Sequence, residues 1–186
     1  MCGIAAFFSR NKPGSLQTLK RATSTLHHRG PDDQGLWLSP DRRVGLGHAR
    51  LSIIDLSNGH QPIANEDGRI HLVVNGEFYD FENQRRALEQ RGHRFRTASD
   101  SEIALHLYEE FGAHCVQQLR GEFAFVLWDE ANQTLFAARD RFGIKPLYCR
   151  RSSTNYAYKL ISKRGLILSL FCHQVMLAIR FFRLDS

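Results

Sequence analysis

The sequence has few cysteines, and their spacing excludes the common cysteine-based sites. There are four in 186 residues, Cys2, Cys115, Cys149 and Cys172, and no two of them form a C-x-x-C pair. No cluster of histidines accompanies them at the spacing of a zinc site. Four cysteines in a chain of this length are also too few for the disulfide framework of a small secreted domain. We therefore expect a reducing, cytoplasmic environment and no metal site.

A long uninterrupted hydrophobic run is also missing. The apolar stretch at residues 3–8 is short and has no basic region before it, so we expect no secretory signal peptide. Residues 160–179 are apolar but are interrupted by charged and polar side chains, and the part from 165 to 179 is too short to span a bilayer. No membrane partner is expected.

Positive charge is in excess, with 25 Lys+Arg against 19 Asp+Glu, but the excess is confined to one part of the chain. Residues 1–148 contain 18 basic and 18 acidic side chains, whereas residues 149–186 contain seven basic side chains and one acidic side chain. A neutral body with a basic tail does not have the composition of a nucleic-acid-binding domain. We therefore expect no nucleic-acid partner and divide the chain into a body, 2–148, and an atypical tail, 149–186.

Hydrophobic periodicity predicts strands, then helices, then strands, rather than a βαβ alternation. This order favours an α+β fold with mostly antiparallel sheets. Ser99-Asp100-Ser101-Glu102 has the pattern of a capping box at a helix start. The expected strands are 3–8, a short one at Trp37, 44–48, 51–55, 70–74, 122–129 and 134–138; the expected helices are about 15–25, 80–91 and 99–112; residues 57–68 are expected to form a loop.

Cys2 stands out by its position. Removal of Met1 would leave a residue that carries both a thiol and a free α-amino group. The amine, with a pKa of about 7.7–8 in the absence of perturbation, can accept the thiol proton and return it to a leaving group. On position alone, however, an ordinary second residue is the simpler interpretation.

Other motifs change that interpretation when they are taken together. In chain order they are Cys2-Gly3-Ile4, His28-Arg29-Gly30-Pro31-Asp32, Gly47–Ile53, Asn75-Gly76-Glu77, Ser99–Glu102 and Arg139–Tyr148. This series closely resembles the class II, N-terminal nucleophile (Ntn hydrolase) type of glutamine amidotransferase domain found at the front of glutamine-hydrolysing asparagine synthetases. The resemblance covers about residues 2–148 and implies a four-layer α/β/β/α sandwich of antiparallel sheets.

The resemblance also implies a reaction. Cys2 would attack the side-chain amide of glutamine and form a γ-glutamyl thioester, which releases ammonia. Asn75 and Gly76 match the family's oxyanion hole, whose donors must be in place before the charge develops. By itself, an Asn-Gly pair is equally typical of a hairpin turn. No histidine is needed as a base, because the N-terminal amine takes that role.

Further residues match the family's glutamine-binding positions. Arg50 matches the residue that binds the α-carboxylate, for which a planar guanidinium is suited. Asp100 matches the residue that binds the α-amino group, although an acid in the first turn of a helix is also favoured by the helix dipole. The remaining expected contacts are Leu51, Ser52, Ile53, Ile54 and Glu77.

The synthetase half of such an enzyme is absent from this sequence. No Ser-Gly-Gly-x-Asp-Ser loop, G-x-x-x-x-G-K-[ST] or G-x-G-x-x-G motif occurs. We therefore expect no cofactor in this chain, because ATP and magnesium would belong to the absent domain.

The resemblance ends near Tyr148, so we expect a sandwich truncated at its C-terminal end, with unpaired sheet edges. An out-of-frame translation or a disordered segment would each account for the tail. The implied function is the glutaminase part of an asparagine synthetase-like ligase. The alternatives are delivery of ammonia to another acceptor on a separate subunit, and an inactive truncated remnant.

Overall fold

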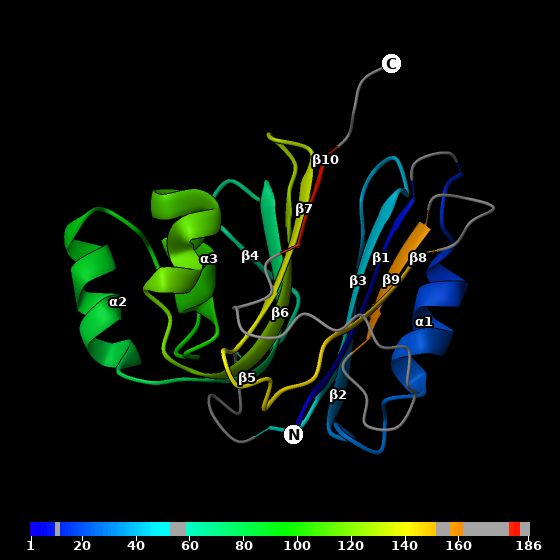
Figure 1. The fold of residues 1–186 in the computed structure, drawn as a ribbon, viewed down its shortest axis with the longest axis horizontal. Coiled ribbons are helices and arrows are strands. Elements are labelled where there is room, and N and C mark those ends of the chain that lie inside the picture. The colour runs from blue at the N-terminus through cyan, green and yellow to red at the C-terminus, as the bar shows by residue number, and fades with distance from the viewer. Residues whose placement is uncertain (10–11, 53–58, 152–156, 162–178, 183–186) are drawn as a thin grey trace.

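Two five-stranded antiparallel sheets pack face to face, and helices cover both outer surfaces (Figure 1). The computed structural model describes residues 1–9, 12–52, 59–151, 157–161 and 179–182, and their side chains up to residue 149. Helix α1 (Leu16–Ser24) covers one sheet, and α2 (Phe81–Gln90) and α3 (Glu102–Phe111) cover the other (Figure 1). The prediction of a four-layer α/β/β/α sandwich is therefore confirmed.

The two sheets have different strand orders, and every pair of neighbouring strands is antiparallel. The first contains, in spatial order, β2 (Asp33–Leu38), β3 (Val44–Arg50), β1 (Gly3–Ser9), β9 (Ala157–Ile161) and β8 (Tyr148–Arg151). The second contains β10 (Ile179–Phe182), β7 (Thr134–Arg139), β6 (Gly121–Asp129), β5 (Ile70–Phe78) and β4 (Ile63–Ala64).

Helices α1 and α2 begin within one or two residues of the predicted positions, whereas α3 begins at Glu102 rather than at Ser99. Ser15 caps α1 by accepting the N–H of Thr18 at 3.0 Å. At α3 the expected capping box does not form, because the Glu102 carboxylate accepts the backbone N–H groups of Arg96 and Thr97 at 2.8 Å each. A 3₁₀ helix, η1 (Gly112–Gln117), follows α3. Within the residues described, none of the helices is both long and apolar enough to cross a lipid bilayer.

Three strand predictions need correction. The predicted loop at 57–68 contains the short strand β4. Leu51 and Ser52, predicted to begin a strand, follow the end of β3, and the rest of that predicted strand lies outside the described residues. Strand β5 does not end at Asn75-Gly76 but continues to Phe78, because both residues pair with β6. The hairpin interpretation of Asn75-Gly76 is therefore wrong.

The tail contributes strands to both sheets. β9 pairs with β1, with Ala5 opposite Ile161, and β10 pairs with β7, with Ala137 opposite Ile179. The last strands of the sandwich were expected to be missing, but the structure places three strands after Leu147. The other residues of the tail lie outside the described residues, and the division of the chain at residue 148 stays a prediction.

Candidate active site

Side-chain alternation along three strands brings the predicted catalytic residues into one space. Successive side chains of a strand point to opposite faces of its sheet. The even-numbered residues of β1 and β3, and Val73 of β5, belong to the apolar layer between the two sheets; these buried residues are Ile4, Ala6, Phe8, Val44, Leu46 and Val73. The same alternation, carried to the strand ends, directs Cys2, His48, Arg50 and Asn75 into the inter-sheet space. The middle of this layer is apolar, and the end that contains Cys2, His48, Arg50 and Asn75 is polar.

A pocket of about 80 Å³ lies at this polar end. It contains a thiol, a guanidinium, carboxylates and the end of a strand. Its lining residues are Met1, Cys2, His48, Arg50, Leu51, Gly59, Gln61, Val74, Asn75, Gly76, Glu77, Ser99, Asp100, Ser101 and Lys145. The structure thus gathers seven of the ten predicted site residues, although they come from four separate segments of the chain.

The Cys2 thiol is held against the end of β3. Its sulfur accepts the N–H of Leu51 at 3.4 Å and lies 3.7 Å from the Leu51 carbonyl. The Cys2 carbonyl accepts Nε of Arg29 at 2.9 Å, and Gly3 pairs with Ala49. These contacts fix the backbone on both sides of a half-buried sulfur. A nucleophile held in this way loses little freedom when a substrate binds.

Among the described residues, no strand pairs with the outer edge of β5 along its second half. β4 pairs only with His71 and Leu72, so the following outward-facing peptide groups need other partners. Side chains supply them at Val74: the N–H donates to Oε1 of Gln61 at 2.6 Å, and the carbonyl accepts Nε2 of His48 at 3.1 Å. At Phe78 the N–H donates to Oδ2 of Asp100 at 2.6 Å.

Gly76 lies between these two capped positions on the same edge. Because N–H groups of an antiparallel strand alternate in direction, the Gly76 N–H points to the same side as those of Val74 and Phe78. Gly76 has a φ of +155°, and a Cβ atom at this position would lie 2.0 Å from the carbonyl oxygen of Glu122. Only glycine fits here without strain. The open edge therefore presents a rigid backbone donor to the pocket, which is the property an oxyanion site requires.

Asp100 is buried, with 3% of its surface exposed, and its carboxylate binds groups of two segments of the chain. One carboxylate oxygen caps the Phe78 N–H, and the other accepts the Ser99 hydroxyl at 3.4 Å. Burial raises the pKa of this carboxyl group above its ordinary value, against the lowering effect of these hydrogen bonds. A cation that entered the pocket would reverse this shift, because an opposite charge favours the ionised form.

Arg50 ends β3 and is 4% exposed. Its backbone carbonyl accepts the N–H of Asp32, and Ser52 donates its own N–H to Oδ2 of Asp32 at 2.7 Å. The His28–Asp32 segment therefore stabilises the backbone around the thiol and Arg50 rather than lining the pocket.

The predicted site residues do not all reach the pocket. Leu51 and Glu77 line it together with Cys2, Arg50, Asn75, Gly76 and Asp100. Ser52 is described but does not line it, because it is tied to Asp32. Ile53 and Ile54 lie outside the described residues, so their predicted contacts stay predictions.

Several lining residues were not predicted, and Lys145 is the most notable. The neighbouring Asp140 accepts the backbone N–H groups of Phe142, Ile144 and Lys145 at 3.0 Å each. The Lys145 ammonium contacts Glu122 at 2.9 Å and the Met1 sulfur at 3.6 Å. The sequence contained no signal for this contact, which depends on how the two sheets pack.

His48 leads to a prediction about acid stability. It is 1% exposed, and burial lowers its pKa to about 4, against the raising effect of its hydrogen bond to Val74. In the unfolded chain the same imidazole takes up a proton near pH 6.5. The contribution of neutral His48 to the free energy of unfolding is therefore fully present above pH 6.5 and is lost as the pH falls towards 4. The free energy of unfolding should drop by up to about 3 kcal/mol over this range.

Denaturant unfolding at pH 7 and pH 4.5 measures this loss. His48→Gln keeps a donor for the Val74 carbonyl and does not titrate, so its loss of stability with acid should be smaller than that of the parent. His28→Gln, at an exposed position, is the control. Equal losses for the parent and His48→Gln would contradict the prediction.

Comparison with known sequences agrees with this geometry. A family model described as "Glutamine amidotransferase domain" matches residues 1–170. The chain is 48% identical to amidase chry2 of Gibberella zeae over 162 residues, which are 80% of this chain and 24% of that protein. It is 40% identical to glutamine-hydrolyzing asparagine synthetase 3 of Bacillus subtilis over 162 residues, which are 85% and 26% of the two chains. The chain thus spans about a quarter of the length of these curated relatives.

Comparison with solved structures concerns the fold alone. The glutamine phosphoribosylpyrophosphate amidotransferase of B. subtilis matches with a TM-score of 0.69 and 20% identity. The match covers 87% of this chain and 42% of that chain. The four-layer sandwich is therefore shared with a solved amidotransferase.

Proposed function

Since the chain belongs to the family of glutamine amidotransferase domains, we propose that it hydrolyses glutamine to glutamate and ammonia with Cys2 as the nucleophile. One observation carries this proposal. A thiol, the amide donors of Asn75 and Gly76, the Arg50 cation and the Asp100 anion line a single pocket. This is the set of groups that an amide hydrolase for a free amino acid needs.

Recognition of glutamine would rest on the two charged residues. The Arg50 guanidinium would bind the α-carboxylate through two parallel hydrogen bonds, and Asp100 would bind the α-ammonium group. Glu77, a second carboxylate of the lining, would add negative charge near that ammonium group. The side-chain amide would then lie towards Cys2 and the open edge of β5.

The chemistry would begin after Met1 is removed, because Met1 itself lines the pocket. The Cys2 amine takes the thiol proton while the sulfur bonds to the amide carbon. The developing oxyanion accepts hydrogen bonds from the Gly76 N–H and the Asn75 side chain. The C–N bond then breaks, the amine returns its proton to the departing ammonia, and a γ-glutamyl thioester remains. Water attacks the thioester next, which releases glutamate and the thiol.

The fate of the ammonia belongs to the proposal as well. Because the chain spans only about a quarter of its curated relatives, we propose that the ammonia serves asparagine formation in a synthetase domain or subunit that this sequence does not contain. ATP and magnesium would act there. A reducing, cytoplasmic location is part of the proposal, because the nucleophile is a thiol that oxidation would inactivate.

Ammonia release from glutamine tests the proposal. The protein is first examined by mass spectrometry to establish that Cys2 is the N-terminal residue. Processed protein should release ammonia and glutamate in equal amounts, and protein that retains Met1 should be inactive. Processed, folded protein that releases no ammonia would favour an inactive remnant and overturn the proposal.

The proposed contact between Arg50 and the α-carboxylate of glutamine gives a separate prediction. Arg50→Lys keeps the charge but loses the two-pronged geometry, so KM for glutamine should rise about 10-fold to 100-fold while kcat changes much less. Steady-state ammonia release over a range of glutamine concentrations measures both constants. Arg43→Lys, on the exposed turn before β3, is the matched control. A fall in kcat at unchanged KM would show that Arg50 does not bind the ground-state substrate.

A further inference from the structure

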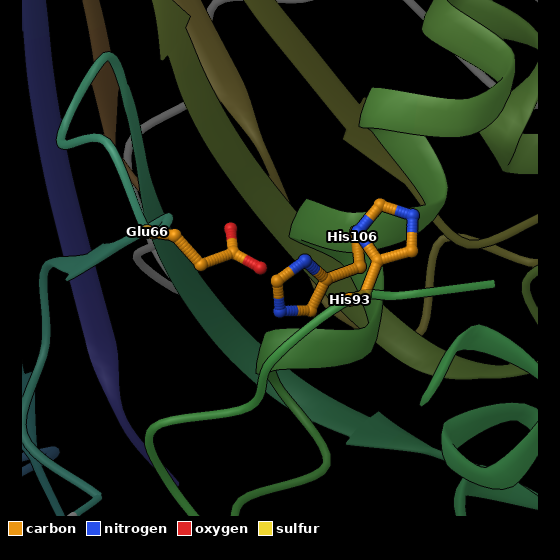
Figure 2. A group of neighbouring side chains, drawn as sticks. All are labelled: Glu66, His93 and His106. Atoms are coloured by element: carbon orange, nitrogen blue, oxygen red, sulfur yellow. The ribbon is translucent and has the colours of Figure 1, made fainter. Parts of the chain in front are cut away.

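Two histidines and two glutamates converge on the outer side of the second sheet, away from the pocket. Glu66 lies in the turn after β4, His93 in the segment after α2, and His106 within α3 (Figure 2). One carboxylate oxygen or ring nitrogen from each of these three residues lies within 4.8 Å of the other two. Figure 2 shows the Glu66 carboxylate directed towards the His106 ring, with the His93 ring on the other side of it.

Glu109 lies against both histidine rings. Its Oε2 atom lies 2.7 Å from Nδ1 of His106 and 3.4 Å from Nδ1 of His93. One carboxylate oxygen of Glu109 therefore faces one ring nitrogen of each histidine. Imidazole nitrogen and carboxylate oxygen are donors that zinc accepts, and four such groups satisfy a tetrahedral ion.

The carboxylates are held by groups of their own. Asn65 donates Nδ2 to the second oxygen of Glu109 at 2.8 Å, and the Arg94 N–H donates to Oε1 of Glu66 at 2.8 Å. Partners of this kind orient the ligands of metal sites. The ligand atoms need to close in by about 1 Å or more to reach the spacing around a zinc ion. Glu66 is exposed, so its carboxylate has room to do so.

The electrostatics of the cluster favour added positive charge. His106 has no exposed side-chain surface, and burial alone would disfavour a charged ring. Carboxylate oxygens of Glu102 and Glu109 nevertheless lie 3.5 Å and 2.7 Å from its two ring nitrogens. A dication in this cluster would therefore be surrounded by negative charge.

We propose that Glu66, His93, His106 and Glu109 form a binding site for a divalent transition metal ion, with zinc as the ion their donors suit best. The site connects the β4–β5 turn to the segment before α3 and to α3 itself. Its role is structural, because none of the four residues lines the pocket. The α3 helix follows directly on Asp100, so the ion would also stabilise the layer that carries this residue.

Zinc titration by calorimetry tests the proposal. The full chain with Cys2→Ala is used, because a reactive thiol would itself bind zinc. We expect one equivalent of Zn²⁺ to bind, and Co²⁺ to give the visible absorption of a tetrahedral site. His93→Gln and Glu66→Gln should each weaken binding about 10-fold or more. His114→Gln, an exposed histidine outside the cluster, should leave it unchanged.

Thermal unfolding supplies a second readout. Zn²⁺ should raise the melting temperature of the parent but not that of Glu66→Gln, because only an ion that binds the folded state stabilises it. Glutamine hydrolysis by otherwise unmodified Glu66→Gln should equal that of the parent. The proposal is overturned if Zn²⁺ does not bind, or if binding survives both His93→Gln and Glu66→Gln.

Discussion

Cys2→Ala is expected to reduce glutamine hydrolysis roughly 10⁴-fold or more, which leaves no activity above background in an ordinary ammonia assay. The substitution removes the atom that forms the covalent intermediate, and no other described cysteine lines the pocket. The fold should be unaffected, because the half-buried thiol contributes only two long contacts to Leu51.

The control is Cys149→Ala, which removes another half-buried thiol outside the pocket. It should keep the parent's rate. A glutamine analogue that alkylates thiols should add its mass to the parent and to Cys149→Ala, but not to Cys2→Ala. Glutaminase activity that survives Cys2→Ala would refute the mechanism.

Asn75→Ala should lower kcat by roughly 10²-fold to 10³-fold, with a much smaller change in KM. The Asn75 amide group would bind the oxyanion, which exists in the transition state but not in the bound substrate. Asn75 is 1% exposed and is paired with Ala124 of β6, so the strand itself should persist. Steady-state kinetics measures the two constants separately.

Asn83→Ala, on the exposed face of α2, is the matched control and should leave both constants unchanged. Thermal unfolding shows whether Asn75→Ala remains folded. A rise in KM at constant kcat would mean that Asn75 binds the ground-state substrate, and the oxyanion role would then be wrong.

Local sequence patterns predicted the elements of the body well. The apolar run of β1, the Ser15 cap of α1 and the glycine after α2 are signals that act within a few residues. The local pattern gave a wrong prediction at Asn75-Gly76, a pair that often forms turns. Here the pair stays in a strand, because all nine residues of β5 pair with β6 along one ladder.

In the tail, the sequence pattern missed strands that the structure contains. The composition of the tail gave no clear strand signal, yet β9 and β10 pair with strands of the body, and β8 pairs with β9. A segment can join a sheet because a strand already in that sheet has unpaired backbone N–H and C=O groups. These unpaired groups belong to the folded sheet, so the sequence of the joining segment does not reveal them.

The sequence by itself determined the family. A cysteine at the second position and a series of ordered motifs resemble a glutamine amidotransferase domain, and no nucleotide-binding loop motif occurs in the chain. These are properties of residue identity and order, which no folding step changes.

Only the tertiary structure decided how those residues are arranged. In the described part of the chain, the edge of β5 at Val74, capped by Gln61 and His48, is open because β4 begins only at Ile63, opposite Leu72. The same packing brings Glu66, His93 and His106 together from segments far apart in the chain. Sequence spacing cannot show either arrangement, because both depend on strand register and on how a helix rests on its sheet.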